Sequence, residues 1–83
     1  MDIDKVWDNI KRNAGELFYQ IRGKEFTYSV VNNGIKLHTT NRSIPKTDVE
    51  KALKYLPLKN TVPLRNLQAP SYLYAILTDE RII

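Results

Sequence analysis

The sequence predicts an α+β fold: an N-terminal helix, a small antiparallel three-stranded sheet with an Asn-Gly hairpin, and two C-terminal helices. Three observations predict this fold. Apolar residues recur at helical spacing near the N-terminus, the pattern changes to strand-like alternation over residues 17–39, and a second helical stripe begins after residue 46. A chain of 83 residues, 42% of them apolar, is the size of one folded domain over residues 1–83.

The first predicted element is an amphipathic helix over residues 2–14. Its apolar side chains are three or four positions apart, which places them on one helix face. Asp2 or Asp4 can cap the first turn, and Gly15 provides a C-terminal stop. Trp7 lies on the apolar face, so we expect its indole in the core.

An antiparallel sheet is predicted next. Over residues 26–30, aromatic and apolar residues alternate with hydroxyl residues, as in a half-buried strand. Residues 22–24 are predicted to form a turn, and Asn33-Gly34 matches the two-residue hairpin turn in which both residues have positive φ. The three predicted strands cover residues 17–21, 25–31 and 35–39.

A second helix is predicted by a capping pattern and an apolar stripe. Residues 40–44 are predicted to be a polar connector. Thr47 and Glu50 have the spacing of a capping box, and apolar residues recur at helical spacing over residues 49–56. Pro57 ends the helix because its ring cannot continue it.

The C-terminal part begins with an irregular loop, predicted over residues 58–69, which includes a helical turn near residues 63–67. The last element, residues 72–77, is predicted as a helix capped by Ser71, although its tyrosine and isoleucine content leaves a strand open. We expect Ile82, in the tail, to enter the core.

The net charge of +4 is unevenly distributed along the chain. Residues 1–35 balance five basic against five acidic side chains, whereas residues 36–65 hold seven basic against two acidic ones, a surplus of five. Such an asymmetry is typical of a surface that faces an anion, although a lysine-rich solvated surface has the same composition. The seven candidate nucleic-acid contacts are Lys36, Arg42, Lys46, Lys51, Lys54, Lys59 and Arg65.

A phosphate cradle is predicted where the third strand leads to the second helix. Residues 39–43 combine hydroxyl and amide side chains with Arg42, and Lys46 follows near the predicted helix N-terminus. An ordinary turn has the same composition. Base stacking is the second binding feature predicted, with core packing as the alternative, and its candidates are Tyr55, Tyr72 and Tyr74.

The sequence predicts no enzyme. His38 is the only histidine, cysteine is absent, and no nucleophile-turn, Walker or dinucleotide-binding motif occurs. Asp48, Glu50 and Lys51 resemble the carboxylate and lysine set of some nucleases, but on a helix their spacing spreads them around the axis, and capping explains the two acids better. We therefore expect no catalytic residue, no metal ligand, no cofactor and no small-molecule substrate.

The chain is expected to work in the cytoplasm. Without cysteine it can form no disulfide, which suits a reducing compartment. The acidic N-terminus lacks a hydrophobic signal stretch, and no apolar run approaches the roughly 20 residues that cross a bilayer. A membrane is therefore not among the expected partners.

Short patterns spread over most of the chain carry a family resemblance. They are Ala14-Gly15, Gly23-x-x-Phe26-Thr27-Tyr28, Ile44-Pro45-Lys46 with Glu50-x-Ala52-Leu53, and Pro70-Ser71-Tyr72-Leu73-Tyr74-Ala75-Ile76-Leu77-x-Asp79-x-Arg81-Ile82. By these patterns the chain resembles small uncharacterised domains of bacteria and their phages, some of which occur in a restriction or mobile-element setting. The resemblance implies a cytoplasmic, DNA-related or phage-defence role and assigns no catalytic residue.

Together these patterns predict a small, basic, non-catalytic module that binds nucleic acid, with DNA expected rather than RNA. The alternative is a protein-interaction module, such as a phage-encoded inhibitor or adaptor. One continuous basic face would favour nucleic acid, whereas scattered lysines around an exposed apolar patch would favour a protein partner.

Overall fold

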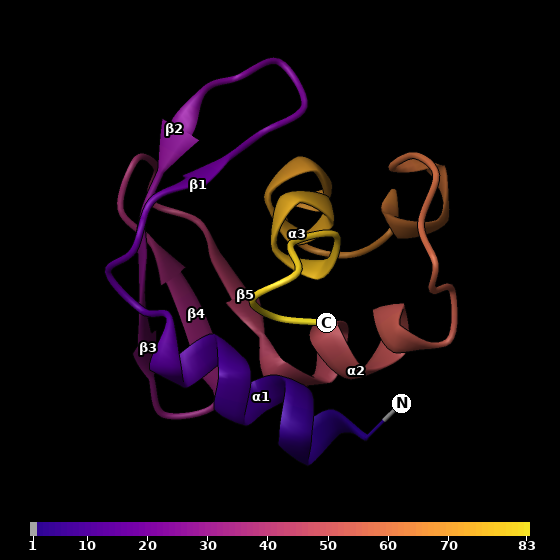
Figure 1. The fold of residues 1–83 in the computed structure, drawn as a ribbon, viewed down its shortest axis with the longest axis horizontal. Helices are drawn as coiled ribbons and strands as arrows, with labels where there is room; N and C mark the ends of the chain where they lie inside the picture. The colour runs from indigo at the N-terminus through magenta and orange to yellow at the C-terminus, as the bar shows by residue number, and fades with distance from the viewer. Residues whose placement is uncertain (1) are drawn as a thin grey trace.

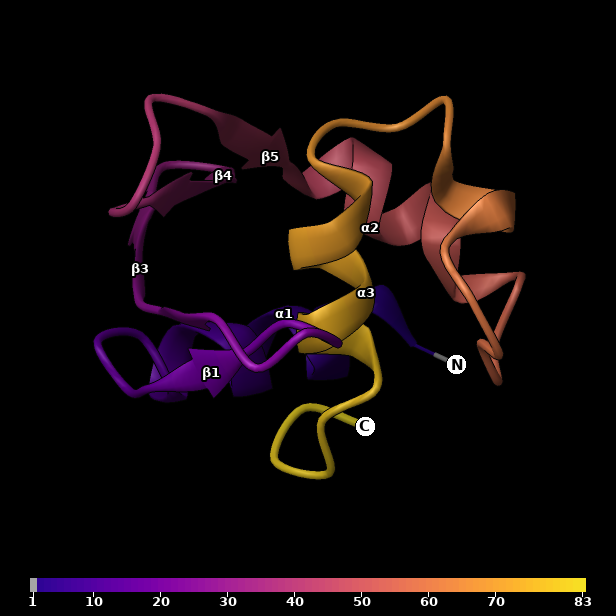
Figure 2. The same ribbon diagram turned by 90° about the horizontal axis from the view of Figure 1, so that it is seen from above.

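The helix closest to the C-terminus stands in the middle of the molecule. In the computed structural model, which describes residues 2–83, the strands lie on one side of this helix and the other two α-helices lie below it (Figure 1). Seen from above, it is enclosed between the three-stranded sheet and the second helix (Figure 2). The elements are α1 (Ile3–Arg12), β1 (Phe18–Tyr19), β2 (Glu25–Phe26), β3 (Tyr28–Val31), β4 (Gly34–Leu37), β5 (Ser43–Pro45), α2 (Lys46–Leu53), the 3-10 turn η1 (Val62–Leu64) and α3 (Pro70–Leu77).

Helix α1 forms as its apolar spacing predicts. The Asp2 carboxylate accepts a hydrogen bond from the Asp4 amide at 3.0 Å, which caps the first turn. Trp7 is buried in the core, as expected. At the other end Gly15 has a φ of +87°, a conformation that glycine adopts without strain, and its amide donates to the Tyr28 carbonyl at 2.8 Å. The helix is thereby attached to the sheet at the point where it stops.

The first predicted strand is not part of the three-stranded sheet. It forms a separate two-stranded sheet in which β1 pairs antiparallel with β2, Phe18 opposite Phe26. The turn between them lies one residue earlier than predicted, because the Gly23 amide donates to the Gln20 carbonyl and Gly23 carries the positive φ of +84°. A three-residue loop that ends in a left-handed glycine is a common hairpin connection.

The hairpin of β3 and β4 is confirmed, but its turn is also displaced by one residue. Asn32 has a φ of +56°, whereas Gly34 is the first residue of β4 and pairs with Val31. The two central residues are therefore Asn32 and Asn33. In this register Tyr28 lies opposite Leu37, so two buried side chains meet; a turn at Asn33-Gly34 would place Tyr28 opposite a threonine instead.

The last two residues of the predicted polar connector, 43 and 44, belong to strand β5. It pairs antiparallel with β4, Ile35 opposite Ile44, and completes the three-stranded sheet in the order β3-β4-β5. Ile44 is fully buried, while the residues that flank it are polar or proline. A three-residue strand with one apolar side chain has no period to detect, and the strand prediction failed here for that reason.

Helix α2 has a different start from the predicted one. It begins at Lys46, with Pro45 at the N-cap and no side-chain cap, so Thr47 lies inside the first turn and the predicted capping box does not form. The Asp48 carboxylate is buried and accepts a hydrogen bond from the backbone amide of Gln68 at 2.9 Å. Asp48 therefore holds the segment before α3 against α2, rather than capping its own helix as predicted.

The last element is a helix, as predicted, and the strand alternative is wrong. Ser71 does not cap it: the N-cap is Ala69, with a φ of +46°, and Pro70 occupies the first helical position that proline favours. The predicted turn over residues 63–67 overlaps η1. Ile82 enters the core as expected, and the Asn9 side-chain amide donates to its carbonyl at 3.0 Å.

Candidate nucleic-acid interface

The cations of residues 36–65 lie on elements that adjoin one another. Strand β4 pairs with β5, β5 runs directly into α2, and the Asp48–Gln68 hydrogen bond joins α2 to the segment that follows η1. Figure 2 shows β4, β5 and α2 in succession across its upper part. The cations follow this path, with Lys36 on β4, Arg42 in the β4–β5 loop, Lys46 and Lys51 on α2, Lys54 and Lys59 after α2, and Arg65 after η1.

Six of these seven cations are exposed and have no carboxylate within 4.0 Å among residues 2–83. Lys46 is the exception. Its Nζ lies 3.6 Å from Asp4 Oδ1 and 5.8 Å from the centre of the Trp7 ring, and its side chain is partly buried. The ammonium group of Lys46 thus connects α2 to α1, which leaves the other six, termed here the free-cation set, available to an anion.

The predicted phosphate cradle has a different setting from the expected one. Residues 39–43 lead into strand β5, not into a helix, so they supply no helix N-terminus. The Arg42 guanidinium donates to Gln68 Oε1 at 3.5 Å, and the Arg42 carbonyl accepts from the Leu37 amide at 3.2 Å. Arg42 is thereby placed beside the segment before α3 while its side chain stays exposed.

The three candidate stacking tyrosines have unequal positions. Tyr72 packs edge-on against Phe26, with ring centres 5.0 Å apart, and its hydroxyl lies 3.3 Å from Thr39 Oγ1. Tyr74 is half-buried and packs against the core. The core-packing alternative therefore describes these two. Tyr55 is 44% exposed, and the Lys54 ammonium lies 5.3 Å from its ring centre.

Hydroxyl groups beside Lys36 form part of the surface that sequence reasoning missed. Ser29 lies opposite Lys36 on β3, and Ser43 lies opposite it on β5. Directly opposed residues in neighbouring strands project from the same face, so the three side chains form one row across the outer face of the sheet. Hydroxyls next to a cation are frequent contacts to phosphate. The alternation of hydroxyls over residues 26–30 was the available signal for Ser29.

His38 has partners that were not visible in the sequence. Its Nδ1 lies 2.7 Å from Thr27 Oγ1, and its Nε2 is hydrogen-bonded to the Ser29 hydroxyl. Among residues 2–83 no carboxylate approaches either ring nitrogen within 4.0 Å. The imidazole is thus held between the hydroxyl of Thr27, which directly precedes β3, and the hydroxyl of Ser29 on β3, beside Lys36 on the outer face of the sheet.

Arg81, near the C-terminus, binds groups within the protein itself. Its guanidinium donates to both Asp79 carboxylate oxygens and to the Leu17 carbonyl, and lies 4.0 Å from the Phe18 ring centre. The hydrogen bonds from Arg81 hold the pKa of Asp79 below its ordinary value, and the same contact raises the pKa of Arg81. Arg81 is therefore not part of the candidate interface.

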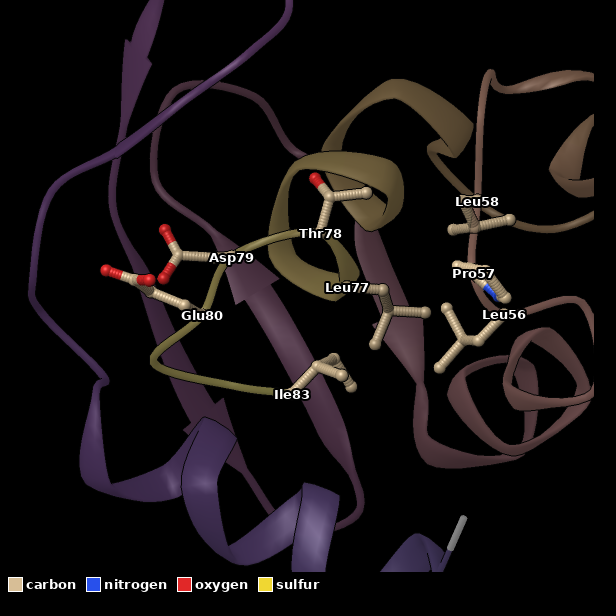
Figure 3. Close-up of a pocket in the computed structure, with 8 residues that line it drawn as sticks. All are labelled: Leu56, Pro57, Leu58, Leu77, Thr78, Asp79, Glu80 and Ile83. Atoms are coloured by element: carbon tan, nitrogen blue, oxygen red, sulfur yellow. The ribbon is translucent and has the colours of Figure 1, made fainter.

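An apolar pocket of about 420 Å³ lies elsewhere, between the exit of α2 and the end of α3. Leu56, Pro57 and Leu58 form one wall, and Leu77 and Ile83 face them (Figure 3). The carboxylates at its rim point away from this apolar interior in the same view. The pocket carries none of the free-cation set, and nothing in the sequence pattern indicated it.

Over residues 2–83, no three histidine, aspartate or glutamate side chains gather where they would hold a metal ion. No helix in this part of the chain is long and apolar enough to cross a membrane. No protein-family model, curated protein or solved structure matches the chain.

Proposed function

We propose that the chain binds the phosphate backbone of duplex DNA as a small non-catalytic module. The observation that carries the proposal is the free-cation set: six exposed cations with no carboxylate partner within residues 2–83, on elements that adjoin one another. Basic side chains in such an arrangement neutralise phosphates and release bound counterions. The resemblance to small bacterial and phage domains supports a cytoplasmic, DNA-related role.

Backbone contact suits the surface better than base stacking. Tyr72 and Tyr74 pack against the protein itself, and the exposed ring of Tyr55 already carries a lysine over one face. Proteins that bind single strands present several aromatic faces in succession. The surface instead offers cations and the hydroxyls of Ser29 and Ser43, groups that bind phosphate without reading sequence. We therefore expect weak binding with little sequence preference.

A fluorescence anisotropy titration of labelled duplex DNA at about 50 mM salt tests this proposal. Dissociation constants for non-specific binding are about 10⁻⁶ to 10⁻⁴ M at physiological salt, and binding at 50 mM salt should be tighter than that. Arg42→Ala should weaken affinity for all duplexes alike, because it removes one free cation. Lys5→Ala, an exposed lysine on α1, is the matched control and should change affinity less. A folded protein that binds no duplex at this salt concentration would refute the proposal.

A comparison of Lys46→Ala with Arg42→Ala distinguishes binding by the free-cation set from binding by net charge alone. Because its ammonium is paired with Asp4, Lys46→Ala should reduce affinity less than Arg42→Ala, although both variants lose one positive charge. Equal losses for the two variants would mean that the position of the cations is irrelevant and that net charge alone drives binding.

The protein-interaction alternative is supported by a different observation. Leu17, Tyr19 and Ile21 expose large apolar side chains in β1 and directly beside it, in a segment that carries none of the free-cation set. If the titration finds no nucleic-acid binding, this alternative takes first place.

A further inference from the structure

His38 and three polar neighbours project from the same face of the β3–β4 hairpin. The pairing of the two strands continues to the residues just outside them, because the His38 amide donates to the Thr27 carbonyl at 3.1 Å. Side chains two positions apart on a strand share a face. His38 therefore lies on the same face as Lys36, and Thr27 on the same face as Ser29. Since Ser29 is opposite Lys36, all four side chains lie on the outer face of the sheet.

This face has room for an anion beside Lys36. An open hollow of about 430 Å³ adjoins the lysine, and its lining includes Val31, Gly34 and Ser43. Lys36, His38 and Ser43 are exposed. Positions two residues apart on one strand are separated by about 6.6 Å, so His38 and Lys36 can contact the same phosphate group.

The two hydroxyls that bind the imidazole respond to its charge. Nδ1 of His38 lies 2.7 Å from Thr27 Oγ1, and Nε2 is hydrogen-bonded to the Ser29 hydroxyl. A neutral imidazole has one N–H group, so it donates to one hydroxyl and accepts from the other, whereas an imidazolium donates to both. When His38 takes up a proton from water, the hydroxyl that had donated to the ring becomes an acceptor. The hydrogen of that hydroxyl is then free to turn toward an anion.

No acidic side chain among residues 2–83 lies within 4.0 Å of either ring nitrogen of His38. Of the nearby phenols, Tyr28 donates to the Ile10 carbonyl inside the core, and the Tyr72 hydroxyl lies 3.3 Å from Thr39 Oγ1. The charged side chains on the adjoining elements are all exposed, and they are Glu25 on β2, Lys36 on β4 and Arg42 in the β4–β5 loop. A proton on His38 therefore adds a cation beside a lysine, and an anion between the two would offset their repulsion.

We propose that the outer face of the sheet holds a phosphate site, termed the His38 site, in which His38 binds a DNA phosphate only in its protonated form. Its other members are Lys36 and the hydroxyls of Thr27 and Ser29. The inference rests on the proposed function, because it adds a contact and a pH dependence to the same DNA surface. Histidine changes its charge between about pH 5 and 8, so duplex affinity rises as the pH falls through this range.

One further phosphate contact determines the expected size of the effect. At about 0.1 M salt, one contact with a slope of about −0.9 corresponds to a gain in affinity on the order of tenfold. Binding is reciprocal: a ligand that prefers the protonated form raises the proton affinity of His38 by the same factor. Saturating duplex DNA should therefore move the midpoint of the His38 titration upward by about one pH unit.

Anisotropy titrations of a labelled duplex at about pH 5.5 and about pH 8.0, at constant ionic strength, test the pH dependence. The parent chain should bind on the order of tenfold more tightly at the lower pH. His38→Gln, which is neutral, should bind at both pH values as the parent does at the higher one. His38→Lys, which is charged throughout, should bind at both as the parent does at the lower one. Lys5→Ala, on α1, is the control and should keep the pH dependence of the parent.

A second measurement needs no variant. His38 is the only histidine, so the imidazole proton resonances in NMR spectra report its protonation directly. The midpoint of its titration is measured with saturating duplex, and separately in about 20 mM sulfate and in chloride of equal ionic strength. Sulfate is an oxyanion that keeps its charge over this pH range, so it tests the His38 site without DNA. Duplex and sulfate should each raise the midpoint above its value in chloride.

The outcomes distinguish this inference from the proposed function. Duplex affinity that is equal at the two pH values, or that changes as much in a folded His38→Gln variant as in the parent, overturns His38 as a DNA contact and leaves the DNA proposal standing. A parent chain that binds no duplex at either pH refutes the proposed function. The sulfate titration then decides whether the His38 site binds an oxyanion, and a midpoint that is the same in sulfate and in chloride overturns it.

Discussion

Tyr28→Phe removes one oxygen atom from the centre of the molecule and tests how α1 is attached to the sheet. The Tyr28 side chain is fully buried, and its hydroxyl donates to the Ile10 carbonyl at 2.7 Å. The Ala14 amide, four residues after Ile10 and the usual helical donor to that carbonyl, bonds to the Lys11 carbonyl instead. The tyrosine hydroxyl therefore donates a hydrogen bond to a carbonyl group at the helix end that receives none from the Ala14 amide.

The expected cost follows from leaving that carbonyl buried without a donor. Removing one partner of a buried hydrogen bond costs about 1–3 kcal/mol in the free energy of unfolding. For a domain of this size each kcal/mol lowers the melting temperature by about 4–8 °C. The ring keeps its packing against Phe18 because phenylalanine has nearly the same shape. The loss therefore reports on the hydroxyl contact and not on a cavity.

The dependence of stability on alkaline pH gives a second test of the buried Tyr28 hydroxyl. Burial raises the pKa of Tyr28 well above its ordinary value of about 10. Above pH 10 the unfolded chain then releases a proton that the folded chain keeps, so this group's contribution to stability falls as pH rises. The slope is about 1.4 kcal/mol per pH unit. Phenylalanine has no such proton, so the stability gap between Y28F and the parent should narrow by about 1.4 kcal/mol from pH 9 to pH 11.

Thermal melts followed by circular dichroism at pH 7, 9 and 11 measure both effects. Tyr55→Phe is the matched control, because Tyr55 is exposed and should melt like the parent at each pH. A Y28F variant that melts within about 2 °C of the parent at pH 7 would show that the Ile10 contact contributes nothing. A gap that stays constant to pH 11 would contradict the burial of the phenol.

Further stability predictions test the contacts of Asp48, the β3–β4 turn and the packing of Trp7. Asp48→Ala should cost about 1–3 kcal/mol in urea unfolding, because it leaves the Gln68 amide without an acceptor, and Asp48→Asn should cost less because it keeps one oxygen. Asn32→Val should cost at least about 1 kcal/mol by thermal melt, since a β-branched residue resists positive φ. Gly34→Ala should stay within about 0.5 kcal/mol, since the nearest atom to the added carbon is 3.6 Å away. Trp7→Ala should cost about 3–5 kcal/mol through a core cavity, measured in the same way.

The fold was predictable where apolar residues are periodic. Helix α1, with Trp7 inward, follows from spacing alone, because one of its faces must be buried. The helix at residues 70–77 was predicted over residues 72–77 with a strand as the alternative, because a short apolar run has no clear period. The β3–β4 hairpin was predictable as an element, but its turn depended on register. Asn32-Asn33 and Asn33-Gly34 differ by one residue, and the packing of Tyr28 against Leu37 favours the first.

The sequence predictions were wrong where tertiary contacts determine the local structure. Ile44 alone carries the burial of β5, and no local pattern marks a strand with one apolar residue. The capping box at Thr47 and Glu50 was locally sound, but β5 runs directly into α2 and leaves no room for a separate cap. For the candidate site, the basic surplus was predictable from composition. The pairing of Lys46 with Asp4 joins residues 42 positions apart and was not.

The salt dependence of duplex DNA affinity tests the central claim most directly. Each neutralised phosphate contributes a slope of about −0.9 to the plot of log affinity against log salt concentration. With four to six cations of the free-cation set taken as phosphate contacts, the proposal predicts a slope of roughly −4 to −5 between 50 and 200 mM salt. Arg42→Ala should flatten it by about one unit. A slope near zero, or no binding to duplex DNA at 50 mM salt by a folded chain, would contradict the account.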